Sequence, residues 1–237
     1  MNKGINEYEK FKVLRPLFGN VKYDENGMPI MKKVNEKEFN FEKAIPLNLQ
    51  NLTKNINGKN VLVFPFNDDK VLEKYWNDPL KYIPLFQTTM GIGTPDYSVL
   101  PNMNINLIKT NIFRNRWLGC TMQYYGINAI PTIGWVYRDT YDICFSGIEP
   151  GGVIMISTIG CQDEKQLFLQ GFNEMKRRLT PSLIIVYGDM IRGMTGRFIN
   201  YVYSDCFNKN TNNIIEQDKL FNLSPIFTIK EAGVYGF

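Results

Sequence analysis

Acidic and hydroxyl side chains follow the ends of several short apolar segments, and these side chains could carry chemistry. Asp69 follows the first such segment, Asp96 and Ser98 follow the second, and Ser157 ends a later one. Carboxylates hold Mg²⁺ through one or two direct contacts plus water, and Mg²⁺ polarises a phosphoryl oxygen or lowers the pKa of a bound water. We therefore predict Asp69 and Asp96 as Mg²⁺ ligands or as the catalytic base. Ser98 and Ser157 are the predicted catalytic-site residues that orient a substrate.

Two further kinds of side chain would complete a site for a phosphate ester. Arg116 or Arg192 would steady the phosphate charge, because a guanidinium group forms two parallel hydrogen bonds with phosphate oxygens. Trp135 or Tyr187 could stack on a base. The other interpretation of the aspartates is structural, because Asp is favoured at the N-cap of a helix.

The sequence contains no histidine, which excludes several kinds of chemistry. Neither a Ser-His-Asp nor a Cys-His catalytic arrangement can be built from this chain. The four cysteines form no Cys-x-x-Cys pair, so a structural zinc site is not expected. They are interpreted as reduced, mostly buried thiols in a reducing compartment.

The candidate residues would be positioned by short β-branched segments that alternate with helical ones. Strands are expected at 61–66, 90–94, 128–135, 141–145, 153–157 and 183–186, and helices at 71–76, 105–125 and 163–178. This alternation is typical of an α/β fold with a mostly parallel sheet and crossover helices. The number of units favours a trimmed TIM-barrel-like arrangement slightly over an open α/β sheet, since a full barrel takes about 250 residues. In both arrangements ligands bind at the carboxyl ends of the strands.

The chain is predicted to divide at residue 60. Residues 1–60 are expected to form an N-terminal β-rich basic segment, with a hairpin turn at Asn26-Gly27. This segment holds 11 basic and 7 acidic side chains, and therefore accounts for the whole formal charge of +4. Residues 61–237 are expected to form the α/β domain.

No apolar run approaches the roughly 20 residues that span a bilayer. The first residues are polar, so no secretory signal is expected. These features predict a cytoplasmic protein without a membrane partner.

An ordered series of short motifs resembles an uncharacterised protein family of bacteria and phages. The series is Pro-Asp-Tyr-Ser at 95–98, Arg-Asn-Arg-Trp-Leu-Gly at 114–119, Ile-Pro-Thr at 130–132 and Val-Tyr-Gly at 186–188. The resemblance covers roughly residues 60–190 and is to a domain of unknown function that phages and mobile elements often encode. It implies a bacterial or phage setting and brings no activity with it.

Two functions remain open from the sequence. In the first, the chain is a metal-assisted enzyme, with Mg²⁺ as cofactor, acting on phosphate esters of nucleotides or nucleic acids. In the second, it is a non-catalytic phage or mobile-element protein that binds a host protein or other host macromolecule, and the strand-end aspartates are helix caps. The first is preferred by a small margin.

Overall fold

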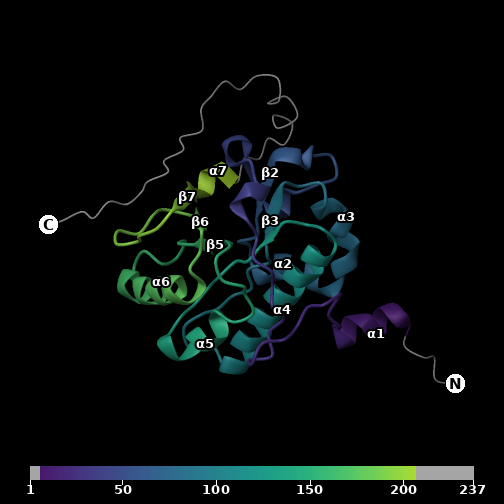
Figure 1. Cartoon of the computed structure of the whole chain (residues 1–237), viewed down its shortest axis with the longest axis horizontal. Coiled ribbons are helices and arrows are strands. Elements are labelled where there is room, and N and C mark those ends of the chain that lie inside the picture. The colour runs from purple at the N-terminus through teal and green to yellow at the C-terminus, as the bar shows by residue number, and fades with distance from the viewer. Residues whose placement is uncertain (1–5, 207–237) are drawn as a thin grey trace.

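Short parallel strands joined by helices form the framework of the molecule (Figure 1). The computed structural model describes residues 6–206. The strands are β1 (Ile45–Asn48), β2 (Val61–Phe64), β3 (Gly91–Gly93), β4 (Ala129–Ile130), β5 (Val153–Ser157), β6 (Leu183–Tyr187) and β7 (Phe198–Tyr201). The α-helices are α1 (Glu7–Leu14), α2 (Asp69–Asn77), α3 (Ile83–Phe86), α4 (Ile105–Tyr124), α5 (Tyr141–Cys144), α6 (Lys165–Leu179) and α7 (Tyr203–Cys206). The 3₁₀ turns are Glu36–Glu38, Phe41–Lys43, Leu49–Asn51, Gly58–Asn60, Pro79–Tyr82 and Arg138–Thr140.

The strands form two parallel sheets in which spatial order follows chain order. One sheet has the order β1-β2-β3-β4 and the other β5-β6-β7. A bridge between Thr132, just past β4, and Met155 in β5 joins them. Every ladder pairs parallel strands, and such pairs need crossover connections. Helices supply most of these crossovers, so the predicted α/β fold with a mostly parallel sheet is confirmed.

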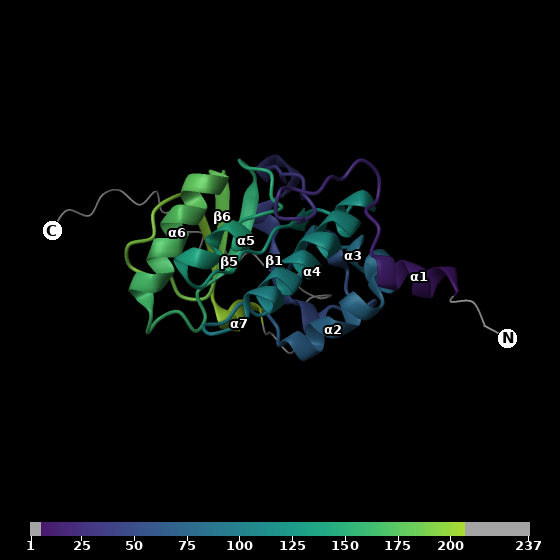
Figure 2. The ribbon, with the colours of Figure 1, turned by 90° about the horizontal axis from the view of Figure 1, so that it is seen from below.

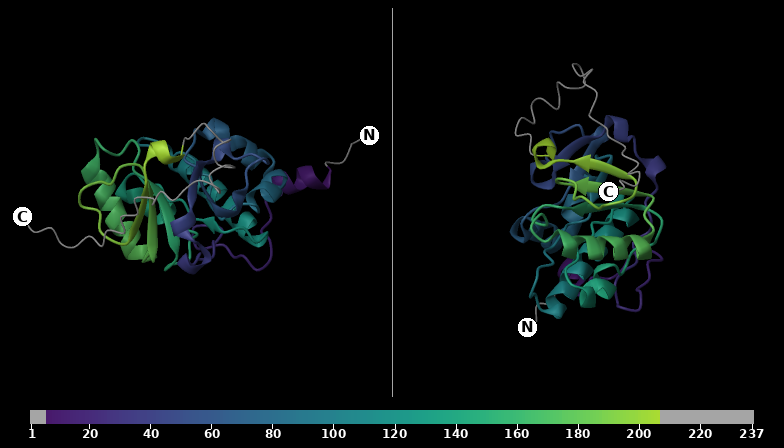
Figure 3. Two further views of the ribbon diagram at one scale, coloured as in Figure 1. Left: turned by 90° about the horizontal axis from the view of Figure 1, so that it is seen from above. Right: turned by 90° about the vertical axis from the view of Figure 1, so that its left-hand side faces the viewer.

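The helices cover outer faces of the two sheets. Seen from below, α4, α5 and α6 lie across the strands (Figure 2), and α6 runs alongside β5, β6 and β7 (Figure 3, right). Helix α1 lies at the end of the molecule opposite α6 (Figure 1). This arrangement leaves the carboxyl ends of the strands as the place where their following loops gather.

Each central strand is buried on both faces. In β2, Val61 and Val63 pack in the cluster beneath α2 and α4, whereas Leu62 and Phe64 point to the opposite side. Residues from β2, β4, β5, β6 and β7 meet there in one apolar cluster that both sheets share. Burial on both faces explains the nearly continuous apolar runs of the strands. In the described part of the chain the strands form two sheets, and no hydrogen-bonded ladder closes β7 onto β1.

Part of the N-terminal segment belongs to the sheet. β1 pairs with β2, with Ile45 opposite Val61. The predicted turn at Asn26-Gly27 is present and brings Tyr23 and Pro29 into an antiparallel bridge. The other described residues before β1 form α1, 3₁₀ turns and loops. The segment therefore supplies one strand to the main fold and is less rich in strands than its sequence predicts.

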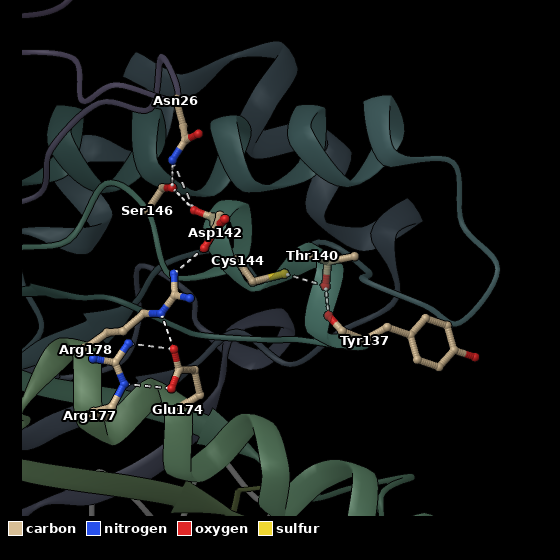
Figure 4. A network of polar contacts seen from close by, with 9 residues as sticks. All are labelled: Asn26, Tyr137, Thr140, Asp142, Cys144, Ser146, Glu174, Arg177 and Arg178. Carbon is tan, nitrogen blue, oxygen red and sulfur yellow. Dashed lines mark hydrogen bonds and ion pairs between the residues drawn. The ribbon is translucent and has the colours of Figure 1, made fainter.

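The strand predicted at 141–145 is wrong, because these residues form the short helix α5. The Tyr141 and Phe145 rings contact each other one helical turn apart, at 5.2 Å between centroids. Arg178 of α6 pairs with Asp142, and Asn26 donates a hydrogen bond to Ser146 (Figure 4). A five-residue apolar run cannot distinguish a strand from a buried turn of helix, and these contacts select the helix.

Strand β7 is absent from the sequence-based prediction. No helix separates it from β6, so the alternation that revealed the other strands is missing here. The polar loop between them, 188–197, carries three glycines with positive φ, including Gly193 at 107°. Those glycines let the chain return to the start of β6 without a helical crossover.

Candidate functional site

A cavity of about 440 Å³ opens at the carboxyl ends of the strands. It is lined by Phe66, Asn67, Asp68, Asp96, Tyr97, Ser98, Val99, Leu100, Ile133, Gly134, Trp135, Ser157, Ile159, Cys161, Phe168, Tyr187 and Tyr203. We call it the strand-end cavity. Five of the predicted site residues meet in it, namely Asp96, Ser98, Trp135, Ser157 and Tyr187. They come from four different strand ends, as expected where parallel strands end together.

Asp96 is the residue of the cavity best suited to proton transfer. Its carboxyl group is partly buried, and burial raises its pKa from 3.8 to about 7. The negative charge of Asp69 raises it further, whereas the Thr132 side chain and the charge of Arg116 favour the ionised form. A group with a pKa near neutrality exists in both protonation states at working pH and can therefore serve as acid or base.

Asp69 lies behind Ser98 and holds it. The Asp69 carboxylate accepts hydrogen bonds from the Ser98 backbone N–H at 2.9 Å and from the Ser98 hydroxyl at 3.1 Å. Asn111 of α4 donates to the Ser98 carbonyl at 2.8 Å. Asp69 itself does not line the cavity. These contacts make it a support of the Asp96–Ser98 loop, and its role as a metal ligand stays a prediction.

The helix-cap interpretation of the aspartates is not supported. Asp68 occupies the N-cap position of α2, yet its side chain makes no capping hydrogen bond. The N-cap residue of α6 is Glu164 rather than Asp163, and it also makes none. Asp96 precedes a turn, and α4 begins only at Ile105. Asp68 and Asp96 are instead among the residues that line the strand-end cavity.

Arg116 does not reach the cavity. It is fully buried, and its guanidinium group donates to the carbonyls of Ser146, Cys144 and Thr132 and to the Asn115 side chain. Within residues 6–206 no carboxylate lies within ion-pair distance of it. Burial lowers its pKa to about 10, so it stays charged at neutral pH. Its positive charge acts on Asp96 from behind rather than on a bound phosphate.

A set of buried polar side chains, which the sequence reading did not identify, surrounds Arg116. The Thr94 hydroxyl donates to Asn115 at 2.8 Å, and the Asn115 amide donates to the Thr132 hydroxyl at 2.7 Å. Thr132 in turn donates to the Thr94 carbonyl at 2.8 Å. We call Thr94, Asn115, Arg116 and Thr132 the Arg116 network. Its sequence signal is the pair Asn111 and Asn115, one helical turn apart, on a helix whose other buried residues are mostly apolar.

The other predicted arginine is also remote from the cavity. Arg192 is exposed in the loop after β6 and is not among the lining residues. Its neighbour in the same loop, Arg197, forms a two-pronged ion pair with Glu36. The lining residues include two aspartates and no lysine or arginine. A phosphate would therefore need a cation to offset the acidic lining.

Aromatic side chains form much of the cavity wall. The rings of Phe66 and Tyr187 are stacked, with centroids 5.0 Å apart and planes at 7°. The Trp135 indole donates to the Phe168 carbonyl at 3.2 Å and lies against Gly171 of α6. A Cβ at Gly171 would come within 2.1 Å of the Trp135 ring. The wall is thus built for flat apolar contact, and Trp135 is fixed by α6.

Metal coordination by the side chains alone has little support here. In the part of the chain that the structure describes, no group of three or more Cys, Asp and Glu side chains could surround a metal ion. Mg²⁺, however, commonly uses one or two carboxylates and takes its other ligands from water and substrate phosphates.

None of the helices between residues 6 and 206 has the length and apolar character to cross a membrane.

The fold is that of an α/β protein with a cavity at the strand ends. Residues 24–203 match the model of DUF4417, a domain of unknown function, and the chain belongs to this family. The family region extends further toward both termini than the resemblance predicted from the motifs.

Similar proteins occur in mycobacteriophages. The chain is 36% identical over 126 residues to the "Gene 1 protein" of Mycobacterium phage D29, covering 52% of this chain and 47% of that protein. It is 35% identical over 128 residues to the "Gene 1 protein" of Mycobacterium phage L5, covering 53% and 56%. The matched region thus spans about half the length of each phage protein. No solved structure matches the chain.

Proposed function

We propose that this chain is a phage or mobile-element enzyme that acts, with the help of Mg²⁺, on phosphate esters of nucleotides or nucleic acids. The observation that carries the proposal is the convergence of Asp96, Ser98 and Ser157 with aromatic side chains in the strand-end cavity. A single cavity offering a proton-transfer group, hydroxyl groups and flat apolar walls suits a nucleotide better than it suits a sugar or a lipid.

The charge of the cavity supports a role for a cation. Asp68 and Asp96 line the cavity, and no basic side chain from residues 6–206 lines it. Ionised carboxylates would repel a phosphate group, and Mg²⁺ held with the help of Asp96 would offset that repulsion by supplying positive charge. Such an ion would favour ionised Asp96. Asp96 would then help to hold the ion, and the ion would supply the charge that neutralises the phosphate.

The test is turnover by the purified full chain with nucleotides and short DNA and RNA, with and without Mg²⁺. Asp96→Asn is expected to lower kcat about 100-fold or more, because positioned acid–base groups contribute on that scale. Asp189→Asn is the matched control, since Asp189 is an exposed aspartate at the end of β6 that does not line the cavity. Equal rates for wild type and Asp96→Asn would overturn the proposal.

Binding of a host macromolecule is the other function that the sequence suggested. Its structural argument was that the aspartates are caps, and the capping hydrogen bonds are not formed. A protein that melts cooperatively but turns over none of these substrates would favour it. Recovery of a specific host partner would then be the next measurement.

A further inference from the structure

Three strand-end side chains carry buried polar atoms that lack a hydrogen-bond partner among the described residues. These atoms are the Asn48 amide nitrogen, the Asn67 amide oxygen and the Tyr187 hydroxyl. Asn48 ends β1, Asn67 follows β2 and Tyr187 ends β6. Buried polar groups are nearly always paired with protein, water or ligand. An unpaired set gathered at strand ends is therefore a place where a polar ligand would gain hydrogen bonds.

Two of these three side chains line the strand-end cavity. Asn67 and Tyr187 are lining residues, whereas Asn48 is completely buried behind them. Asn67 is held by Asn48, because its amide nitrogen donates to the Asn48 side-chain oxygen at 2.8 Å. The same Asn48 oxygen accepts the Gln50 backbone N–H at 3.0 Å. The orientation of the Asn67 amide is thus fixed, and its oxygen accepts no hydrogen bond from the described residues.

The Tyr187 hydroxyl is fixed by packing. Its ring is stacked on Phe66 and contacts Phe64 at 5.7 Å, and the side chain is 1% exposed. The Asn48 amide acts on the hydroxyl and lowers its pKa against a larger rise caused by burial. The Asn48 amide thus lies near the Tyr187 hydroxyl as a donor, although the two do not reach full hydrogen-bond geometry. The hydroxyl proton of Tyr187 therefore remains available to an acceptor on a ligand.

We propose that Asn67 and Tyr187 form a subsite that hydrogen-bonds the edge of a nucleobase, with Asn48 as the residue that positions Asn67. The inference rests on the proposed function in taking a nucleotide as the ligand. Asn67 accepts an N–H from the base, and Tyr187 donates to a ring nitrogen or carbonyl of the base. Both groups are neutral, and one acceptor together with one donor is the pattern that a base edge complements. A phosphate group, which has only acceptors, would leave the Asn67 oxygen unpaired.

The neighbouring aromatic side chains favour the same ligand class. Phe66 and Trp135 line the cavity and are only partly buried. A base stacks favourably on an aromatic side chain whatever its identity, because every base has a flat π-face. A phosphate group gains little from such walls. The subsite thus combines edge recognition with flat contact.

The experiment measures binding of the free nucleosides uridine, guanosine, cytidine and adenosine to the full chain by calorimetry, without Mg²⁺. At least one is expected to bind. Tyr187→Phe removes only the hydroxyl and is expected to weaken that binding about tenfold, since one hydrogen bond contributes on the order of 1 kcal/mol. Removing an unpaired buried hydroxyl should not lower the melting temperature. Asn67→Ala is expected to weaken binding at least as much.

Tyr201→Phe is the matched control. The Tyr201 hydroxyl is also buried and unpartnered among the described residues and its ring lies in the same apolar cluster, but it does not line the cavity. Unchanged affinity in this variant, with loss in Tyr187→Phe, supports the subsite. Equal affinity of wild type and Tyr187→Phe, or no nucleoside binding, overturns it.

Nucleosides separate this inference from the proposed function because they lack the phosphate. Asp96→Asn is expected to retain nucleoside binding while losing turnover. Nucleoside binding without any turnover would overturn the phosphate-ester proposal and leave the subsite standing. Turnover that is unaffected by Tyr187→Phe and Asn67→Ala would overturn the subsite and leave the phosphate-ester proposal standing.

Discussion

The molecule buries polar side chains in two neighbouring regions and treats them differently. In the Arg116 network, behind Asp96, side chains bond to one another and to main-chain carbonyls, and Arg116 alone makes four hydrogen bonds. In front, at the cavity, Asn67 and Tyr187 keep atoms without partners. An unsatisfied buried group costs about 1–3 kcal/mol, so the two regions differ in how much pairing with a ligand would stabilise them. The first is complete without a ligand, and the second is not.

The two regions distinguish polar residues that position Asp96 from polar residues that are available to bind a ligand. Polar residues whose bonds are all internal set the position and the electrostatic surroundings of Asp96, as Arg116 does. Polar residues at a cavity whose atoms lack a hydrogen-bond partner can form that bond with a ligand. Substitutions should therefore affect stability in the first region and binding in the second.

The largest effect is expected from Arg116→Met. The change leaves three main-chain carbonyls and the Asn115 side chain without their donor in a buried place, so the free energy of unfolding should fall by about 3–5 kcal/mol. Urea denaturation measures it. Arg177→Met is the control, because Arg177 is exposed and pairs only with Glu174, and such pairs contribute under about 1 kcal/mol. Similar losses in both variants would remove the distinction between the two regions.

The second prediction concerns the pH dependence of stability. The pKa of Asp96 is about 7 in the folded protein and 3.8 ordinarily. Between these values the folded state holds a proton that the unfolded state has released, so stability falls as pH rises from about 4 to about 7. Above that window this group adds no further change. Denaturation of wild type and Asp96→Asn across this range should show a shallower decline in the variant, and parallel curves would contradict the assigned shift.

A steric change in the cavity wall gives a smaller effect. Gly171→Ala places a methyl group against Trp135, and overpacking of this kind costs about 1–3 kcal/mol. That loss exceeds the gain of about 1 kcal/mol expected from Ala over Gly in a helix. The melting temperature should fall and the tryptophan emission should shift. Gly134→Ala, beside Trp135 but with nothing within 4 Å of the added atom, should leave both nearly unchanged.

The smallest effect is expected at an exposed pair away from both regions. Glu36→Gln breaks the ion pair with Arg197, whose side chain is 52% exposed. Loss of stability should stay below about 1 kcal/mol and shrink with added salt. A loss as large as that of Arg116→Met would show that exposed polar contacts also support the fold.

The sequence predicted which residues gather at the strand ends, with Asp69 as an exception that does not line the cavity. Parallel strands end together, so Asp96, Ser98, Ser157, Trp135 and Tyr187 could be placed in one region from the strand pattern alone. Their chemical roles stay predictions. The rule says nothing about which way a helical side chain turns.

The two arginines of α4 illustrate that limit. Arg114 stacks over the Tyr97 ring at 4.0 Å and pairs with Glu73, whereas Arg116 turns into the core. Their positions in the sequence are equally plausible for either role. Only the packing of α4 against the sheet and α5 decides between them. For the same reason the sequence did not predict Asn48 and Asn67 as site residues. Their proposed role depends on amide atoms that lack a hydrogen-bond partner, and only the structure shows this.

The agreement between strand order and chain order has a consequence for synthesis. Each strand from β2 to β7 pairs with the strand that precedes it in the chain or, for β5, bridges to it. Every strand therefore leaves the ribosome after its partner, and the sheets can grow vectorially from a nascent chain. The cavity is completed later than the sheets begin to form, because its lining residues extend along the chain from Phe66 to Tyr203. A ligand can therefore contact the complete cavity only after Tyr203 has been synthesised, when every strand of the first sheet has already left the ribosome.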